Sequence, residues 1–433
     1  MIITLIVSIL TFLLLTLSII FFPSIKIGRK NIGTYWVVAL LGAFLLLICG
    51  CVPIDVVYHN LTVDTEINPI KILILFLSMT FLSIVLDELG LFKWASVKAI
   101  KIASSNQLSI FLSLYFLSAI LTIFTSNDIV ILTLTPFICF LCKNIKVNPI
   151  PYLIGEFMAA NTYSMMLIIG NPTNIYLATS AGINFLEYVK VMALPTIGAG
   201  IVEVLLVLLI FHKSLCQKIE KVYEEVVVKD KLETIIASIH LLVCLVFLVI
   251  SSYLHIEMWL ISCICALSLL FVLILFKIIR RKYDDTLYKS FVRLPFELIP
   301  FVLSMFVIII TLDYENIISK VVSFLGDSNT VFTYGISSFL ASNIINNIPM
   351  SMLYSHLISF LDESLILKAT YSSIVGSNIG AFLTPIGALA GIMFTTLTDK
   401  YGTKLNFKTF IKYGALISIP VLATTLFILT LVL

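Results

Sequence analysis

Apolar segments of about 20 residues recur along the whole chain, separated by short polar segments. Each is long enough to cross the hydrocarbon core of a bilayer, which is about 30 Å thick. Charged residues make up 12% of the 433 residues, against about 25% in an average soluble domain. The sequence therefore predicts an all-α polytopic membrane protein and leaves no room for a sizeable soluble domain.

Two apolar regions, about 108–142 and about 329–361, are too long for a single crossing. The first would form a helix of about 52 Å at 1.5 Å per residue. Lys residues flank both of its ends, whereas Asp362 and Glu363 follow the second region. Because Lys and Arg accumulate on the cytoplasmic side, we expect two re-entrant hairpins that enter the membrane from opposite faces.

Polar residues interrupt both regions at their centres. The first contains Ser126, Asn127 and Asp128, and the second contains Asn346 and Asn347. A charged residue at the centre of a spanning helix costs about 2.5–3.5 kcal/mol on insertion scales, so the default interpretation is a functional site. Irregular backbone at this depth is tolerated only when it is buried in protein or lines a cavity. The alternative is a polar loop or a hydrogen-bonded packing residue.

A broken helix is predicted after each hairpin, over about 151–182 and about 369–397. Pro removes a backbone donor and Gly weakens a helix. Asn171 and Thr384 each precede a Pro, the pattern of an N-cap followed by Pro at the first helical position. The residues predicted to shape the breaks and hairpin tips are Gly170, Pro172, Pro349 and Pro385.

Hairpin and broken helix recur in the same order in both halves. The spacing is 219 residues from Asn127 to Asn346 and 213 residues from Pro172 to Pro385. An odd number of crossings separates the hairpins, so the halves are predicted to be inverted. We expect about ten transmembrane helices and two hairpins, divided into a first repeat (1–211), a cytoplasmic linker (212–233) and a second repeat (234–433).

The distribution of positive charge predicts the orientation in the plasma membrane. Of the 27 Lys and Arg residues, only four fall in segments predicted to be external: Lys71, Lys190, Lys320 and Lys368. This bias is the one that sets membrane topology. It predicts that both termini are outside the cell.

Inverted repeats with broken helices at the midplane are typical of secondary transporters, whose binding site lies at the repeat interface. Four helix N-termini would point at one region, each with about half a positive charge. Such a region suits an anion or a small hydroxylated solute. The candidate binding residues are Ser126, Asn127, Asp128, Asn171, Thr173, Asn174, Asn346, Asn347, Thr384 and Gly387, with Glu156, Asn161 and Asn378 as candidate cavity-lining residues.

Asp128 breaks the pseudo-symmetry, because its counterpart in the second half is the neutral Asn347. A lone carboxylate at this depth could hold a coupling proton or coordinate sodium at the hairpin tips. The alternative is that Asp128 only caps its own hairpin arm.

The motifs at the tips and breaks resemble those of the ion transporter superfamily, closest to its ArsB branch of arsenical pump membrane proteins. The segments that carry the resemblance are Thr125–Asp128, Gly170–Ile175, Asn346–Pro349 and Thr384–Gly387. The resemblance implies two inverted five-span repeats, an elevator-like motion and often a homodimer. The tips differ from the Ser-Asn-Thr signature of the carboxylate-transporting branch, which is related through the divalent anion:sodium symporter fold. The first break reads Gly170-Asn171-Pro172, where arsenical pumps have a Ser-Asn-Leu-like sequence.

We expect a transporter rather than an enzyme, because the chain contains no phosphate-binding loop, His-rich metal set or nucleophile motif. No cofactor and no nucleic acid partner are expected. The hypotheses are proton-coupled efflux of arsenite or antimonite, and a sodium- or proton-coupled anion or dicarboxylate importer or sodium/proton antiporter. A partner ATPase is left open. A channel or sensor would not require paired breaks and an inverted repeat.

Overall fold

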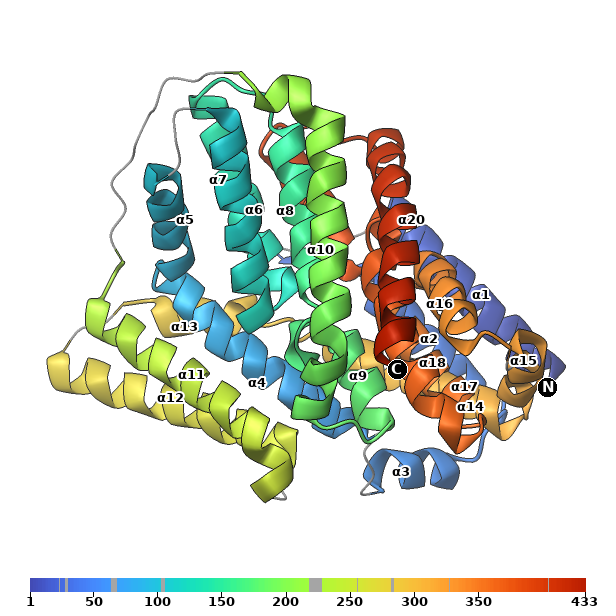
Figure 1. The fold of residues 1–433 in the computed structure, drawn as a ribbon. Coiled ribbons are helices and arrows are strands. Elements are labelled where there is room, and N and C mark those ends of the chain that lie inside the picture. Colours follow the sequence, from blue (N-terminus) through green and yellow to red (C-terminus); the bar gives the residue numbers. More distant parts are fainter. Residues whose placement is uncertain are drawn as a thin grey trace.

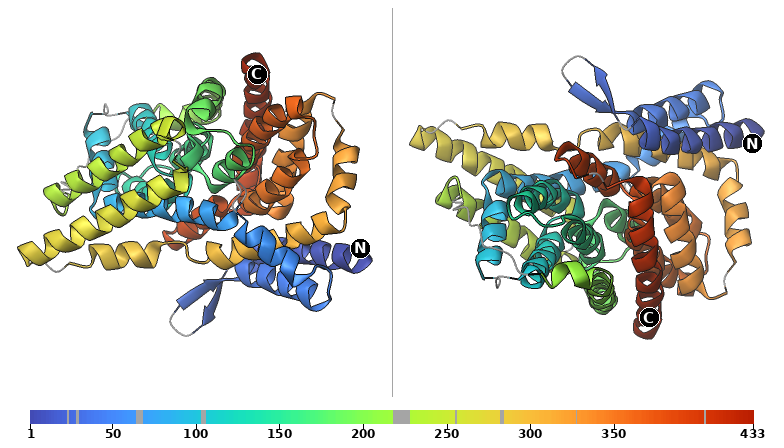
Figure 2. Two further views of the ribbon diagram at one scale, coloured as in Figure 1. Left: turned by 90° about the horizontal axis from the view of Figure 1, so that it is seen from below. Right: turned by 90° about the horizontal axis from the view of Figure 1, so that it is seen from above.

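A computed structural model describes the chain except residues 23, 28–29, 64–67, 103–105, 218–227, 255, 282–283, 327 and 404. Within the described residues, nine helices are long and apolar enough to cross a membrane. The prediction of an all-α polytopic membrane protein is confirmed, with one small exception near the N-terminus. There, β1 (Ser24–Ile27) and β2 (Lys30–Gly33) form an antiparallel ribbon that projects from the body (Figure 2).

The first half begins with α1 (Ile2–Phe21) and α2 (Thr34–Ile48), which pack against each other. The rest of this half consists of α3 (Ile54–Thr62), α4 (Pro69–Glu88), α5 (Leu91–Ile102), α6 (Gln107–Phe124), α7 (Asn127–Asn144), α8 (Ile150–Tyr163), η1 (Ile168–Gly170), α9 (Pro172–Ser180) and α10 (Phe185–Leu215). Helices α6 and α7 form the first predicted hairpin, and α8, η1 and α9 form the first broken helix.

The second half repeats this order after three further long helices. Its elements are α11 (Lys231–Leu254), α12 (Met258–Arg280), α13 (Thr286–Arg293), α14 (Leu298–Tyr314), α15 (Ile317–Leu325), α16 (Thr330–Ile345), α17 (Asn347–Ile358), α18 (Glu363–Gly380), η2 (Pro385–Gly387), α19 (Leu389–Lys400) and α20 (Phe407–Val432). Helices α16 and α17 form the second hairpin, and α18, η2 and α19 form the second broken helix.

The two halves run in opposite directions. In Figure 1, α10 rises from the end of α9, whereas α20 descends to the C-terminus beside it. The second arm of each hairpin packs against the broken helix of the other half: α19 lies against α7, and α9 lies against α17. Both halves therefore contribute to one unit, formed by α6–α10 and α16–α20, which we call the intertwined unit.

Close helix contacts hold the second hairpin against its broken helix. Helix α16 packs along α18, and Gly376 and Gly380 lie in the interface. A Cβ added at Gly376 would lie 2.8 Å from the backbone nitrogen of Phe339. Small residues allow the two backbones to approach closely. Close packing matters here because the hydrophobic effect does not drive helices together within a bilayer.

A second group of helices packs along one side of the intertwined unit. It contains α2 packed on α14, and α4 packed on α12 and α13. Figure 2 shows α11 and α12 at the edge of the molecule, away from α16 and α18. We call this group, α1–α5 and α11–α14, the outer frame.

Four short helices were not predicted: α3, α5, α13 and α15. Helix α13 illustrates the reason, because Tyr288 and Val292 are exposed while Thr286 and Ser290 are buried. A short helix with one apolar and one polar face gives no membrane-length hydrophobic signal. In the predicted linker, α10 extends to Leu215 and α11 begins at Lys231, while residues 218–227 lie outside the described residues.

Candidate functional site

The tip of the first hairpin is bound to the first broken helix by a pair of amides. Asn127, at the start of α7, donates through Nδ2 to Oδ1 of Asn161 in the last turn of α8, at 3.0 Å. Asn161 in turn donates to the carbonyl oxygen of Phe157, at 2.8 Å. Asn127 and Asn161 are both buried. The hairpin tip is therefore fixed to the helix that leads into the break.

Asn378 of α18 connects the first break to the second half. Its Oδ1 accepts hydrogen bonds from Ser164 Oγ at 2.8 Å and from Asn171 Nδ2 at 2.9 Å. Its Nδ2 donates to Oδ1 of Asn174 at 2.7 Å and to the carbonyl oxygen of Ile374 at 2.8 Å. Ser377 adds a bond to the hydroxyl of Thr173, at 3.1 Å. These side chains form the inter-half network.

The local sequence explains why the first break lies at this position. Pro172 lacks an N–H group, so a helix cannot continue through it, but Pro suits the first position of a new one. Asn171 caps α9 by accepting from the backbone N–H of Thr173 at 3.2 Å. At Gly170, an added Cβ would lie 2.9 Å from the Cα atom of Ser164. The break therefore folds back tightly onto the end of α8.

A second network surrounds the tip of the second hairpin. Asn343 Oδ1 accepts from the hydroxyl of Thr384 at 2.7 Å, and Asn343 Nδ2 donates to the carbonyl oxygen of Gly380 at 2.9 Å. Asn346 donates to the carbonyl oxygen of Ile386 at 2.9 Å. We call this group the second-tip network.

Caps and a close glycine contact shape the second network as they do the first. Thr384 caps η2, which begins at Pro385, and Asn346 caps α17. Asn346 has a φ of 71° and a ψ of 155°, a backbone conformation that residues other than glycine rarely adopt. An added Cβ at Gly387 would lie 2.6 Å from the carbonyl oxygen of Gly380. Pro349 lies buried in the first turn of α17.

Helix α18 carries both networks. Asn378 belongs to the inter-half network, and Gly380, two residues later, belongs to the second-tip network. The two predicted sets of polar residues are thus both held by the C-terminal end of α18.

Two polar atoms at the hairpin tips are buried and have no hydrogen-bond partner among the described residues: Ser126 Oγ and Asn347 Oδ1. Ser126 precedes α7 but does not cap it through its side chain. Buried polar atoms in native proteins are rarely unpaired, so these two are available to a ligand or water.

Asp128 lies just inside α7, where its backbone N–H donates to Asn127 Oδ1 at 2.9 Å. The side chain is half-buried and lies near enough to Tyr35 of α2 for an electrostatic interaction. The carboxyl group therefore lies by the boundary between the first hairpin and the outer frame. Among the described hydrogen bonds and ion pairs, it does not join the inter-half network.

Among the described residues of the first half, two further carboxyl groups are buried, and both bind hydroxyl groups. Glu156 of α8 accepts from Thr135 of α7 at 3.0 and 3.2 Å. Glu203 of α10 accepts from Tyr115 of α6 at 2.8 Å and also from Thr162. These bonds tie helices of the first half together. Glu156 is not brought into either amide network by the described bonds.

Sequence comparison identifies the family. The sequence matches the family model described as CitMHS, citrate transporter, over residues 19–366. The chain belongs to this family. It is 26% identical over 418 residues to the arsenical pump membrane protein of Escherichia coli (strain K12), covering 92% of this chain and 93% of that protein. It is 24% identical over 384 residues to a 46 kDa membrane protein of Mycobacterium leprae (strain TN), covering 84% and 86%.

A solved structure supports the fold. The YdaH transporter of Alcanivorax borkumensis superimposes on this member of the CitMHS family with a TM-score of 0.56 at 13% identity. The match covers 99% of this chain and 97% of that one, and its topology is described as unusual. With the family match and the sequence relatives, which establish the role, the chain is a multi-pass membrane transporter of the ArsB/CitMHS group, as its motifs predict.

Some residues of the networks were not among the predicted binding residues. Ser164 follows α8 without any motif that distinguishes it, and Asn343 lies one turn before the second tip, in the long apolar region 329–361. The depth of Asn343 in the apolar region was a usable signal, because a polar residue there needs a partner. Ser164 carried no such signal, since serine is common in spanning helices.

Proposed function

We propose that this chain is a secondary active transporter that moves a small anion or a hydroxylated oxyanion-type solute across the plasma membrane. The observation that carries the proposal is the pairing of both hairpin tips with broken helices through amide networks. Transporters of this plan bind substrate where such breaks meet.

The chemistry of the networks favours a solute with hydroxyl or oxyanion groups. Asn and Thr side chains offer donors and acceptors, and the helices that begin at the breaks and tips present free N–H groups. The unpartnered Ser126 hydroxyl and Asn347 carbonyl add one polar contact from each tip. Within the described residues, the hydrogen bonds of both networks connect neutral groups.

The first candidate is proton-coupled efflux of arsenite or antimonite, because similar proteins are named arsenical pump membrane proteins. The second is sodium- or proton-coupled uptake of an anion or dicarboxylate, because the family model is named for citrate transport. A sodium/proton antiporter of the same fold is the third. All three use the same tips and breaks and differ in what occupies them.

Asp128 is proposed as the coupling residue. It is the one carboxylate at a hairpin tip, and it lies beside the boundary that would slide if the intertwined unit moved against the outer frame. Asp128→Asn keeps the size and removes the charge. Transport should then lose its dependence on the proton or sodium gradient, while substrate binding persists.

The deciding experiment is flux into proteoliposomes under imposed proton or sodium gradients, with arsenite, phosphate, sulfate, citrate and sodium as test solutes. Asp362→Asn, an exposed position before α18, is the matched control. If Asp128→Asn remains coupled to the same gradient as the parent, the coupling role is wrong. If no test solute moves under either gradient, the proposed transport function is wrong.

The proposed orientation places both termini outside the cell, as the charge distribution predicts. Reporter fusions at each terminus test it directly. A homodimer is also proposed from the resemblance, and the mass of the detergent-solubilised protein, measured by light scattering, would establish it.

A further inference from the structure

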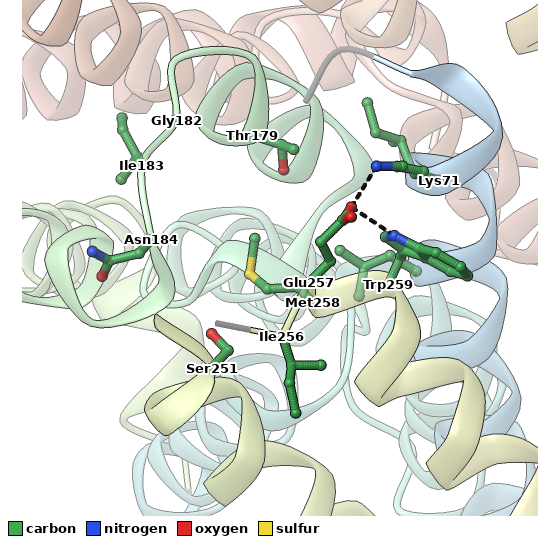
Figure 3. Close-up of a pocket in the computed structure, with 12 residues that line it drawn as sticks. Lys71, Thr179, Gly182, Ile183, Asn184, Ser251, Ile256, Glu257, Met258 and Trp259 are labelled. Atoms are coloured by element: carbon green, nitrogen blue, oxygen red, sulfur yellow. Dashed lines mark hydrogen bonds and ion pairs between the residues drawn. The ribbon is translucent and has the colours of Figure 1, made fainter. Parts of the chain in front are cut away.

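A cavity of about 350 Å³ lies away from the hairpin tips, between the intertwined unit and the outer frame. One wall is the turn between α9 and α10, and the opposite wall is formed by the start of α4 and the α11–α12 connection (Figure 3). Its volume is within the range of small-molecule sites, about 300–1,000 Å³. The elements that line it meet near their ends, on the face that the charge distribution predicts to be external.

An ion pair occupies the polar side of this cavity. Lys71 Nζ lies 2.6 Å from Glu257 Oε2, and Trp259 Nε1 donates to the same oxygen at 2.7 Å. Side-chain exposure is 18% for Lys71 and 44% for Glu257, so water reaches the carboxylate. Glu257 therefore holds two donors with one oxygen atom, and it would keep the Trp259 bond if it left Lys71.

The opposite wall offers a further polar group. Thr179 Oγ1 is buried and has no hydrogen-bond partner among the described residues. Figure 3 shows Thr179 across the cavity from Glu257. Apolar side chains, including Ile72, Leu75 and Ile183, line the remainder. A cavity with a cation, an unpaired hydroxyl and apolar walls suits an organic anion better than water alone.

The cavity is also aligned with the candidate site. Helix α9 begins at the capped break and its last turn contributes Thr179, so about 11 Å of helix separates the two. Helix α4, which carries Lys71, packs against α9. A solute moving along α9 would therefore pass Lys71 on its way between the candidate site at the break and the face predicted to be external.

We propose that this cavity is a second, peripheral anion-binding site, in which the carboxylate or oxyanion group of the solute displaces Glu257 from Lys71. When the cavity holds no solute, the Glu257 carboxylate occupies the position of the anion beside Lys71. Trp259 stays hydrogen-bonded to Glu257 while the solute replaces it at Lys71. The site takes small organic anions such as citrate, and neutral arsenite is not a ligand. This inference rests on the proposed transport of anions.

Trp259 provides the test, since the chain has three tryptophans. In a Trp36→Phe/Trp94→Phe background, citrate should change the fluorescence of Trp259, because the carboxylate beside the indole moves. Glu257→Gln removes the competing charge but keeps an acceptor for Trp259. It should tighten citrate binding about fivefold, the upper limit for a partly exposed ion pair.

Lys71→Met should abolish the fluorescence response, and Lys71→Arg should retain it and show that the fold is intact. Lys368→Met, an exposed position on α18, is the control for loss of a positive charge. A response that survives Lys71→Met, or that weakens in Glu257→Gln, overturns the proposal. A protein that transports citrate without any Trp259 response also overturns it, while the transport function stands. A Trp259 response without transport of any solute leaves this site standing and refutes the transport function.

Discussion

Replacing Asn378 by Ala should be the most disruptive single change in the inter-half network. Two groups lose their partner: the Asn171 amide donor and the Asn174 carbonyl acceptor. Ser164 keeps a bond to the carbonyl oxygen of Asn161, at 2.6 Å. Each buried unpaired group costs about 1–3 kcal/mol, so the expected destabilisation is about 2–6 kcal/mol.

Two comparison variants should be less destabilised than Asn378→Ala. Asn161→Ala removes the only described partner of the Asn127 amide donor, which predicts about 1–3 kcal/mol. Ser377→Ala removes a donor to Thr173, but that hydroxyl still donates to Asn171 Oδ1, at 3.1 Å, so the loss should be smaller. In detergent, Ser377→Ala should therefore have the highest apparent melting temperature of the three variants, Asn161→Ala an intermediate one and Asn378→Ala the lowest.

A double variant tests the mechanism rather than the size of the effect. In Asn171→Ala/Asn378→Ala, the unpaired donor of Asn171 is absent, so the double variant should be less destabilised than the sum of the single ones. Strict additivity, or an Asn378→Ala protein as stable as Ser377→Ala, would refute the view that these amides are held by mutual hydrogen bonds.

Three further predictions concern other contacts. Gly376→Val should force α16 and α18 apart and lower the melting temperature by more than Gly376→Ala, with overpacking costing about 1–3 kcal/mol; equal melting temperatures would show that the interface adjusts. Glu203→Ala leaves the Thr162 hydroxyl without its carboxylate and should cost about 1–3 kcal/mol, whereas Glu203→Gln keeps an acceptor and should recover most of the melting temperature. In the connection before α13, burial favours a higher pKa for Asp284, but the Lys277 ammonium and a backbone N–H outweigh it and lower the pKa to about 2. Because this folded-state pKa lies below the ordinary value of about 3.9, the stabilisation is present above about pH 4 and is lost as the pH falls toward 2. Asp284→Asn should therefore lower the melting temperature at pH 7, by the equivalent of at most about 1 kcal/mol, and the difference should shrink below pH 4; a difference that is constant from pH 7 to pH 3 would contradict this pKa.

Long-range features of the fold could be predicted because the bilayer imposes a length on apolar segments. The hairpin expected over about 108–142 occupies Gln107–Asn144, and the break expected at Gly170–Asn174 lies there. Membrane-spanning length and proline chemistry are local properties, so the sequence alone reveals them.

The hydrogen-bond partners of the site residues could not be predicted in the same way. Nothing in the sequence around Asn378 indicates that it bonds to Asn171 and Asn174, more than 200 residues away. By pseudo-symmetry, Asn378 corresponds to Asn161, yet Asn161 binds the hairpin tip of its own half. Equivalent positions in two repeats share a local backbone, but their contacts depend on side chains brought together only by the complete fold.

The exchange of contacts between halves, α9 with α17 and α19 with α7, has a consequence for how such a protein is assembled. During synthesis, the first hairpin is complete before its packing partner α19 has left the ribosome. Until then, the surface of α7 that will contact α19 has to be covered by lipid or by another membrane protein. If the chain is divided within residues 218–227 and the fragments are produced together, each fragment therefore carries a surface that matches the other, and transport activity should return only when both are present in one membrane.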